Sequence, residues 1–234
     1  FAEGYTGTSY NREVMVVKGG LDGSLTRTDI KAADKKITYG GIDYYYVKIG
    51  DREWFRNNLA SVLSGTPYVN EEVTSDVFGR FYNYNEAKTA CPEGWRLPAE
   101  DDWMSLAEAM GVSVEDKYEP FDDVASKFLV NAAFNGMSML EYWPEVGDID
   151  NESRLSLMPF GFANLGNSTA EGKYPSASFE GLFDYAVYWT ADEVDGEDGM
   201  AYYRYLISDQ PDMFVGKGDV NTFGASVRCV RDAK

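Results

Sequence analysis

The sequence predicts an α+β fold of short antiparallel sheets with two or three helices and long loops. Strand-like runs with alternating apolar residues lie towards both ends of the chain, and helix-like runs lie between them. Aromatic residues make up 15% of the 234 residues, which suits strands and also surfaces that stack on sugars or peptides. No repeat or low-complexity linker is visible, so we expect one domain over residues 36–234. Residues 1–35 are expected to form an N-terminal extension with a pairing strand at 13–18.

The first strands of this domain are expected at residues 37–40, 42–49 and 52–55. Gly40 and Gly41 separate the first two runs, and a two-glycine connection is typical of a tight hairpin. These residues therefore predict an antiparallel hairpin followed by a third short strand.

Helices are expected at residues 83–90, 99–110 and 122–133. The second follows Pro98, carries three acidic residues in its first turn and repeats apolar residues at helical spacing. The third shows a similar apolar face.

Later strands are expected at residues 155–162, 182–190, 201–207 and 225–231. Pro159 gives the first of these the character of an edge or a bulge, because proline cannot donate to a strand ladder.

The amino-acid composition excludes several classes of function. Asp and Glu number 39 against 21 Lys and Arg, and a net charge of −18 repels nucleic acid and anionic membranes. No run of about 18 apolar residues predicts a membrane span. The absence of histidine removes Ser-His-Asp and Cys-His catalysis and His-ligated zinc, so we expect a binding protein in preference to an enzyme.

The two cysteines stand at structural landmarks. Cys91 ends a predicted helix and Cys229 lies in the last predicted strand, which suggests a disulfide that closes a long loop. Two buried free thiols, or a reactive or copper-binding thiol pair, are the alternatives.

Five blocks of the sequence form a recognisable pattern: residues 46–59, residues 90–98 with Trp103, and residues 188–190, 201–206 and 224–230. Together they resemble the Fibrobacter succinogenes major paralogous domain, a family of Bacteroidetes and Fibrobacter surface or secreted proteins. The resemblance implies an exported bacterial protein, secreted or anchored at the outer surface, often by a lipid attached upstream. The family's biochemical role is generally unassigned.

Part of the pattern also resembles the C-type lectin-like fold. In that fold a helix-end cysteine pairs with a last-strand cysteine, as Cys91 and Cys229 would. Formylglycine-generating enzymes share the broad fold, but an oxidase of that type would need its cysteines free and close together.

The analogy places ligand-binding loops at residues 143–150, 192–199 and 208–222, which we expect to lie together. Trp143 is the aromatic residue expected at a ligand surface, with the core as its alternative. Calcium is a weaker expectation, because the acidic runs equally suit solvated loops and Gln210-Pro211-Asp212 follows the Trp189 strand instead of preceding it. The candidate ligand residues are Trp143, Asp148, Asp150, Asp195, Asp198 and Asp212.

The sequence therefore predicts an exported cell-surface binding or adhesion module with a glycan or protein ligand and no resident cofactor. A divergent formylglycine-generating-like enzyme, a carboxylate-based hydrolase and a structural component of a surface or pilus assembly are the alternatives.

Overall fold

The computed structural model describes most of the chain from residue 34 onward. Residues 1–33, including the strand expected at 13–18, lie outside the described part. The described ranges are residues 34–61, 63–131, 142–143, 146–169 and 173–234.

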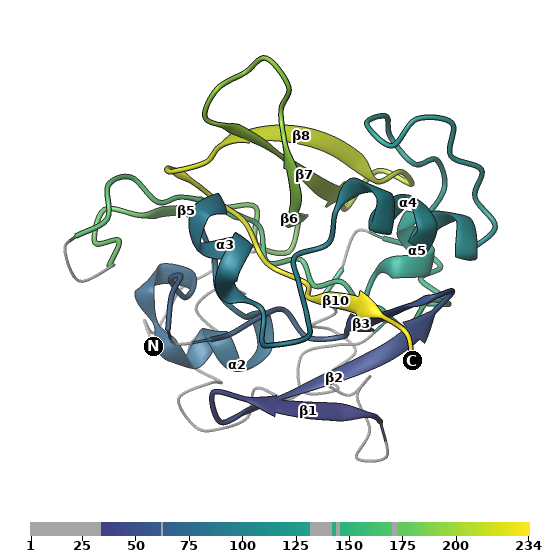
Figure 1. Ribbon diagram of the computed structural model, residues 1–234, viewed down its shortest axis with the longest axis horizontal. Coiled ribbons are helices and arrows are strands. Elements are labelled where there is room, and N and C mark those ends of the chain that lie inside the picture. Colours follow the sequence, from purple (N-terminus) through teal and green to yellow (C-terminus); the bar gives the residue numbers. More distant parts are fainter. Residues whose placement is uncertain (1–33, 62, 132–141, 144–145, 170–172) are drawn as a thin grey trace, which may run out of the picture.

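One four-stranded antiparallel sheet joins the start of the domain to its end. Gly40 and Gly41 have positive φ angles of 59° and 82° and form the predicted hairpin turn. The last strand pairs with the third, so sequence-distant segments meet in this sheet (Figure 1). Its order is β1 (Lys36–Tyr39), β2 (Ile42–Ile49), β3 (Arg52–Phe55) and β10 (Val230–Asp232).

Two three-stranded antiparallel sheets contain the other strands that the structure describes. Figure 1 shows β8 at the opposite side of the molecule from β1 and β2. The longer sheet has the order β6 (Tyr185–Glu193), β7 (Met200–Ile207) and β8 (Phe214–Asp219). The shorter one has the order β5 (Ser178–Glu180), β4 (Phe162–Asn164) and β9 (Phe223–Gly224).

The two longer helices confirm the prediction from sequence. In α3 the Asn83 side chain accepts from the Glu86 amide at 2.8 Å, and the Glu86 carboxylate accepts from the Asn83 amide at 3.1 Å. Among the described residues the α-helices are α2 (Ser75–Phe78), α3 (Tyr84–Ala90), α4 (Glu100–Ala109) and α5 (Ala125–Phe128), and the 3₁₀ turns are η1 (Tyr68–Asn70) and η2 (Glu72–Thr74).

The prediction of a helix at residues 122–133 is correct for only one turn, Ala125–Phe128, and wrong beyond it. Leu129 takes an extended conformation and bridges Leu157 in parallel, and the Val130 amide donates to the Leu157 carbonyl at 3.0 Å. Pairing with a distant segment therefore overrides the local helical pattern. Residues 132–133 are not among those described.

Two expected strands are also shorter than predicted. Residues 155–162 are mostly irregular, and β4 begins only at their end. Of residues 225–231, only the end belongs to β10, and the preceding part follows an extended path held by isolated backbone bonds. The buried Arg228 guanidinium donates to the carbonyls of Leu155 and Ser156 at 2.7 and 2.9 Å, so a side chain supplies hydrogen bonds that a strand ladder would otherwise make.

The disulfide between Cys91 and Cys229 ties the end of α3 to the last segment. The two Cα atoms lie 5.8 Å apart. Both cysteines of the chain are thereby used, and the free-thiol alternatives are wrong.

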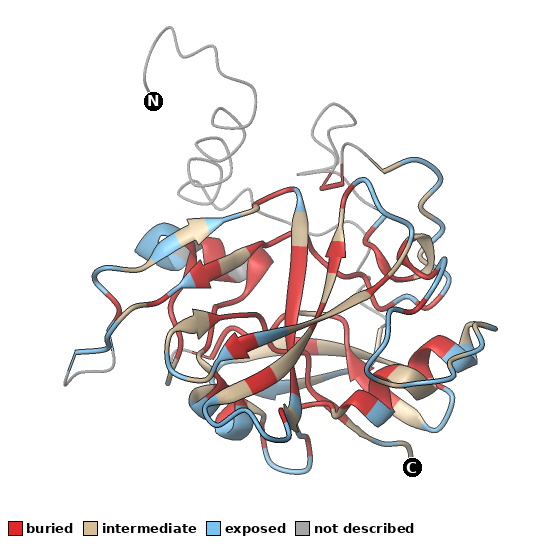
Figure 2. Cartoon of the chain, turned by 90° about the horizontal axis from the view of Figure 1, so that it is seen from above, coloured by how far each residue is buried: buried red, intermediate tan, exposed pale blue. Residues whose placement is uncertain are grey.

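Aromatic side chains fill the interior around this link. The Trp54 and Trp103 rings lie 4.9 Å apart in one buried cluster, and Trp95 lies 4.4 Å from Phe55 in the other. In Figure 2 the buried residues run through the middle of the molecule and the exposed residues occupy its outer loops.

Candidate functional site

Trp143 does not lie at a ligand surface. Its side chain is only 1% exposed, and its indole N–H donates to the Leu157 carbonyl at 3.0 Å. A buried tryptophan with a satisfied N–H is a core residue, so the alternative placement in the core is the correct one.

Two of the three predicted ligand loops do meet. Residues 146–147 and 208–211 line a shallow groove of about 410 Å³ beside α5. Asp148 and Asp150 are exposed near it, and Asp150 accepts from the Glu152 amide at 2.8 Å. Asp212 accepts from the Asp123 amide at 2.9 Å. Asp150 and Asp212 therefore serve as acceptors for backbone amides of these loops.

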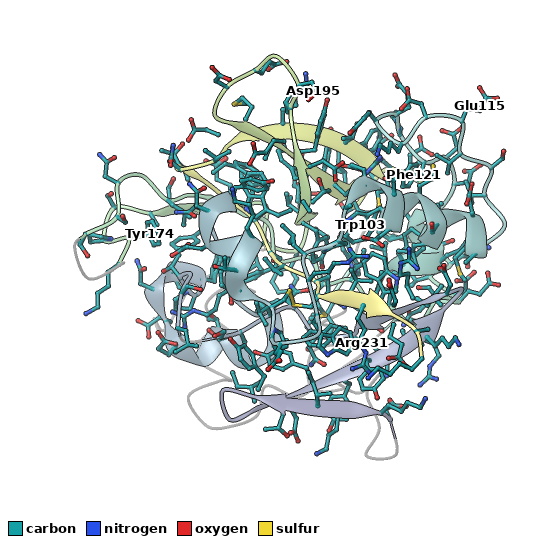
Figure 3. The ribbon with its side chains drawn as sticks, viewed as in Figure 1. Trp103, Glu115, Phe121, Tyr174, Asp195 and Arg231 are labelled. Atoms are coloured by element: carbon teal, nitrogen blue, oxygen red, sulfur yellow. A yellow bond between two sulfur atoms is a disulfide. The ribbon has the colours of Figure 1, made fainter. Side chains whose placement is uncertain are left out.

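The third loop, residues 192–199, does not reach this groove and contacts only the far end of the 208–222 segment, where the Val220 amide donates to the Gly199 carbonyl at 2.9 Å. The expectation that all three loops gather in one place is therefore wrong. The third loop joins β6 to β7 at one end of the sheet, whereas residues 208–211 follow β7 at the other end. The eight residues of β7 separate the two ends by about 26 Å. Asp195 and Asp198 are exposed on this hairpin, and Asp195 is labelled at its tip in Figure 3. Within the described ranges, no three acidic or cysteine side chains converge as a metal site.

A larger groove lies on another face, and we name it the Arg80 groove. Its volume is about 660 Å³, within the range of small-ligand sites. Tyr174, on its wall, lies on the opposite side of the molecule from Glu115 in Figure 3. The groove is lined by residues 63–67, Asn70, Glu72, Arg80, Glu86 and residues 173–175.

A glycine fixes the loop that forms one wall. Gly65 has a φ of 73°, and a Cβ there would lie 2.6 Å from the Phe81 carbonyl oxygen. Thr66 and Phe81 exchange two backbone hydrogen bonds of 2.8 Å, which hold the loop against the segment before α3. Only glycine permits this close approach of two backbones.

The same loop exposes apolar side chains and carries backbone strain. Leu63 is 77% exposed and Val69 is 43% exposed. Val69 has a φ of 48°, which is a genuine outlier for a β-branched residue, and Asn70 follows with a φ of 59°. Strain of this kind costs on the order of 1–3 kcal/mol and is concentrated at functional sites.

Arg80 supplies a buried positive charge to the groove. Its side chain is 7% exposed; Nη1 donates to the Glu72 carboxylate at 2.6 Å and Nη2 donates to the Gly65 carbonyl at 3.0 Å. Its Nε–H has no acceptor among the described residues. A buried donor without an acceptor is uncommon and calls for an explanation.

Tyr174 closes the other wall through a polar network. Its hydroxyl accepts from the Asn83 amide side chain at 2.8 Å. Burial raises the pKa of Tyr174, and the neighbouring Glu86 carboxylate raises it further. Glu86 also accepts from the Gly65 amide at 3.3 Å, so the capping box of α3 is part of the groove.

The sequence profile of the Fibrobacter succinogenes major domain matches residues 47–231. The chain belongs to this family. The matched residues include both cysteines and every residue that lines the Arg80 groove. No curated protein and no solved structure shows a significant match to the chain.

Sequence reasoning missed the groove of this Fibrobacter succinogenes major domain because its members come from three separate segments. Two local signals pointed to it. Gly65-Thr66-Pro67 is a turn-forming run, and Leu63 is a large apolar residue in a polar loop. Neither signal indicates that Arg80 turns inward beneath that loop.

Proposed function

We propose that the chain is an exported cell-surface binding module and that the Arg80 groove is its ligand site. The observation that carries the proposal is the coincidence of three features in one place. The exposed Leu63, the positive φ of Asn70 and the buried guanidinium of Arg80 all lie in the lining of the Arg80 groove. Exposed apolar groups beside a few fixed polar groups are what a ligand site requires.

Export is supported by the disulfide, because such bonds persist in oxidising compartments. The proposed location is secreted or anchored at the outer surface, with a lipid anchor upstream as the expected attachment. No described helix is both long and apolar enough to span a bilayer. The link between a helix end and the last strand also supports a C-type lectin-like arrangement, which we keep as part of the proposal.

A thiol-dependent oxidase is disfavoured, because both cysteines are consumed in the disulfide. The carboxylates of the groove also have other partners. Glu86 caps α3, and Glu72 pairs with Arg80. Binding therefore fits the groove better than carboxylate-based hydrolysis does.

The test compares two tryptophan substitutions. Ser64→Trp would fill the Arg80 groove, and Ser113→Trp would add the same bulk to an exposed loop on the other side. Both purified variants and the parent chain are applied to a glycan array and to bacterial surface proteins, with and without calcium.

We expect saturable binding by the parent and by Ser113→Trp, and its loss in Ser64→Trp at unchanged folding. Equal binding by all three proteins would contradict the assignment of the groove.

A further inference from the structure

We propose that the Arg80 groove binds a saccharide that carries a carboxylate, such as a uronic acid, and that the Glu72 carboxylate holds the position which the ligand carboxylate takes. This rests on the proposed function and names the ligand class of the same site. It follows from the hydrogen bonds that Arg80 makes and lacks.

The guanidinium of Arg80 is only partly used. Arginine has five N–H donors in a planar fork, which matches a carboxylate with two parallel bonds. The contacts of Arg80 are one to Glu72 and one to the Gly65 carbonyl, while Nε–H has no acceptor in the described part of the chain. A ligand carboxylate that takes the place of Glu72 would accept from Nη1 and add a second, parallel bond from Nη2.

Glu72 is a weak internal competitor for this position. Its side chain is 69% exposed, whereas that of Arg80 is 7% exposed. The Glu72 carboxylate stays largely solvated in the pair, and a ligand carboxylate that replaces it leaves the buried Arg80 charge paired. A ligand can therefore displace Glu72 at small cost.

The backbone of the groove argues for a sugar and against a peptide carboxylate. Peptide termini are captured by free backbone N–H groups, but the amides of Gly65, Thr66 and Asn70, which line the groove, already have acceptors. The amide of Gly65 donates to Glu86, that of Thr66 to Phe81, and that of Asn70 to Pro67.

Side chains, in contrast, offer hydrogen-bonding groups that suit sugar hydroxyls. The Ser64 hydroxyl and the Asn70 side-chain N–H groups make no hydrogen bond to any described residue. Pro67 and Pro175 add apolar lining for the faces of a sugar ring.

The charge of the molecule makes this site distinctive. With a net charge of −18, most of the surface repels anions. Arg80 and Lys173 balance Glu72 and Glu86 in the lining of the groove, so an acidic ligand meets less repulsion there than over the rest of the surface.

The experiment measures the Kd of trigalacturonic acid by calorimetry, with maltotriose as the neutral probe. Glu72→Gln removes the competing carboxylate and should tighten trigalacturonate binding about twofold to fivefold. The matched control is Glu197→Gln, which removes one negative charge from an exposed pair with Lys217 and should leave Kd unchanged. Arg80→Lys keeps the charge but loses the planar fork, and should weaken binding about tenfold or more.

The outcomes separate the two proposals. If maltotriose binds as tightly as trigalacturonate and Glu72→Gln changes neither Kd, the carboxylate proposal is overturned while the groove remains a binding site. If neither probe binds but Ser64→Trp abolishes capture of another partner, the saccharide class is wrong and the proposed function stands. Glu72→Gln keeps the test decisive even if Arg80→Lys fails to fold, because Glu72 lies at the surface.

Discussion

Arg204 and Glu100 form an ion pair in which neither side chain is exposed to solvent. Arg204 Nε donates to Glu100 Oε2 at 2.6 Å, joining β7 to the first turn of α4. The other two nitrogens of Arg204 donate to the carbonyls of Lys117 and Glu119, and its guanidinium lies 3.8 Å from the centre of the Phe121 ring. One side chain thus organises the loop that follows α4.

This pair predicts a pH dependence of stability. Burial raises the pKa of Glu100 to about 7 against the attraction of Arg204, while its ordinary value is 4.5. The folded protein then holds more protons between these values, so its stability falls as pH rises through that window. Glu100→Gln should reduce this pH-dependent loss of unfolding free energy by up to about 3 kcal/mol. Urea unfolding at about pH 5 and about pH 8 measures it. Glu108→Gln, an exposed change on the same helix, should keep the parent profile.

Removing the disulfide should destabilise the fold without altering the groove. Closing a loop of 138 residues restricts the unfolded chain and contributes about 4–5 kcal/mol in the chain-entropy model. The double variant Cys91→Ala with Cys229→Ala should show a lower thermal midpoint, and its folded fraction should bind as the parent does. Loss of binding in the folded fraction would mean that the disulfide also shapes the site.

Gly65→Ala should deform the Arg80 groove. The new Cβ would meet the Phe81 carbonyl at 2.6 Å, in addition to the cost of a positive φ. Gly94→Ala is a matched control, because Gly94 has a φ of 81° and no atom within 4 Å of the added Cβ. We expect a loss of about 1 kcal/mol for the control and clearly more for Gly65→Ala. If chemical denaturation gave the same loss of unfolding free energy for both variants, the loop at Gly65 would accommodate the new Cβ without extra cost.

Asp102 predicts a second pH effect, of opposite sign. Burial would raise its pKa, but hydrogen bonds from Arg96, Arg52 and the Ala99 amide outweigh burial and lower it below 3.8. The stability that Asp102 contributes is present above the unfolded value of 3.8 and is lost as pH falls through the folded pKa. Asp102→Asn should therefore reduce stability at neutral pH and flatten the acid limb of the stability curve. Asp101→Asn, at an exposed neighbour, should leave that limb intact.

Elements whose signals were local could be predicted from the sequence. The hairpin of β1 and β2 follows from Gly40-Gly41, and α3 follows from Asn83 and Glu86 as a capping box. The disulfide followed from the positions of the only two cysteines.

Features that depend on tertiary contacts could not be predicted in this way. Leu129 leaves a helical pattern to pair with Leu157, and Arg228 replaces a strand ladder with side-chain hydrogen bonds. Trp143 stands beside a proline and an acidic loop, which favoured the surface, yet it is buried. The Arg80 groove combines residues 63–86 with the distant residues 173–175, so no single window of sequence contains it.

The disulfide between Cys91 and Cys229 leaves one wall of the Arg80 groove inside the covalently closed loop and the other wall outside it. The wall of residues 63–86 lies outside the covalent loop of residues 91–229, and the wall of residues 173–175 lies inside it. Tension applied between β1 and β10 would pass through the disulfide and bypass the inner wall. Under such tension the wall of residues 63–86 carries the force, whereas the wall of residues 173–175 stays unextended as long as the disulfide is intact.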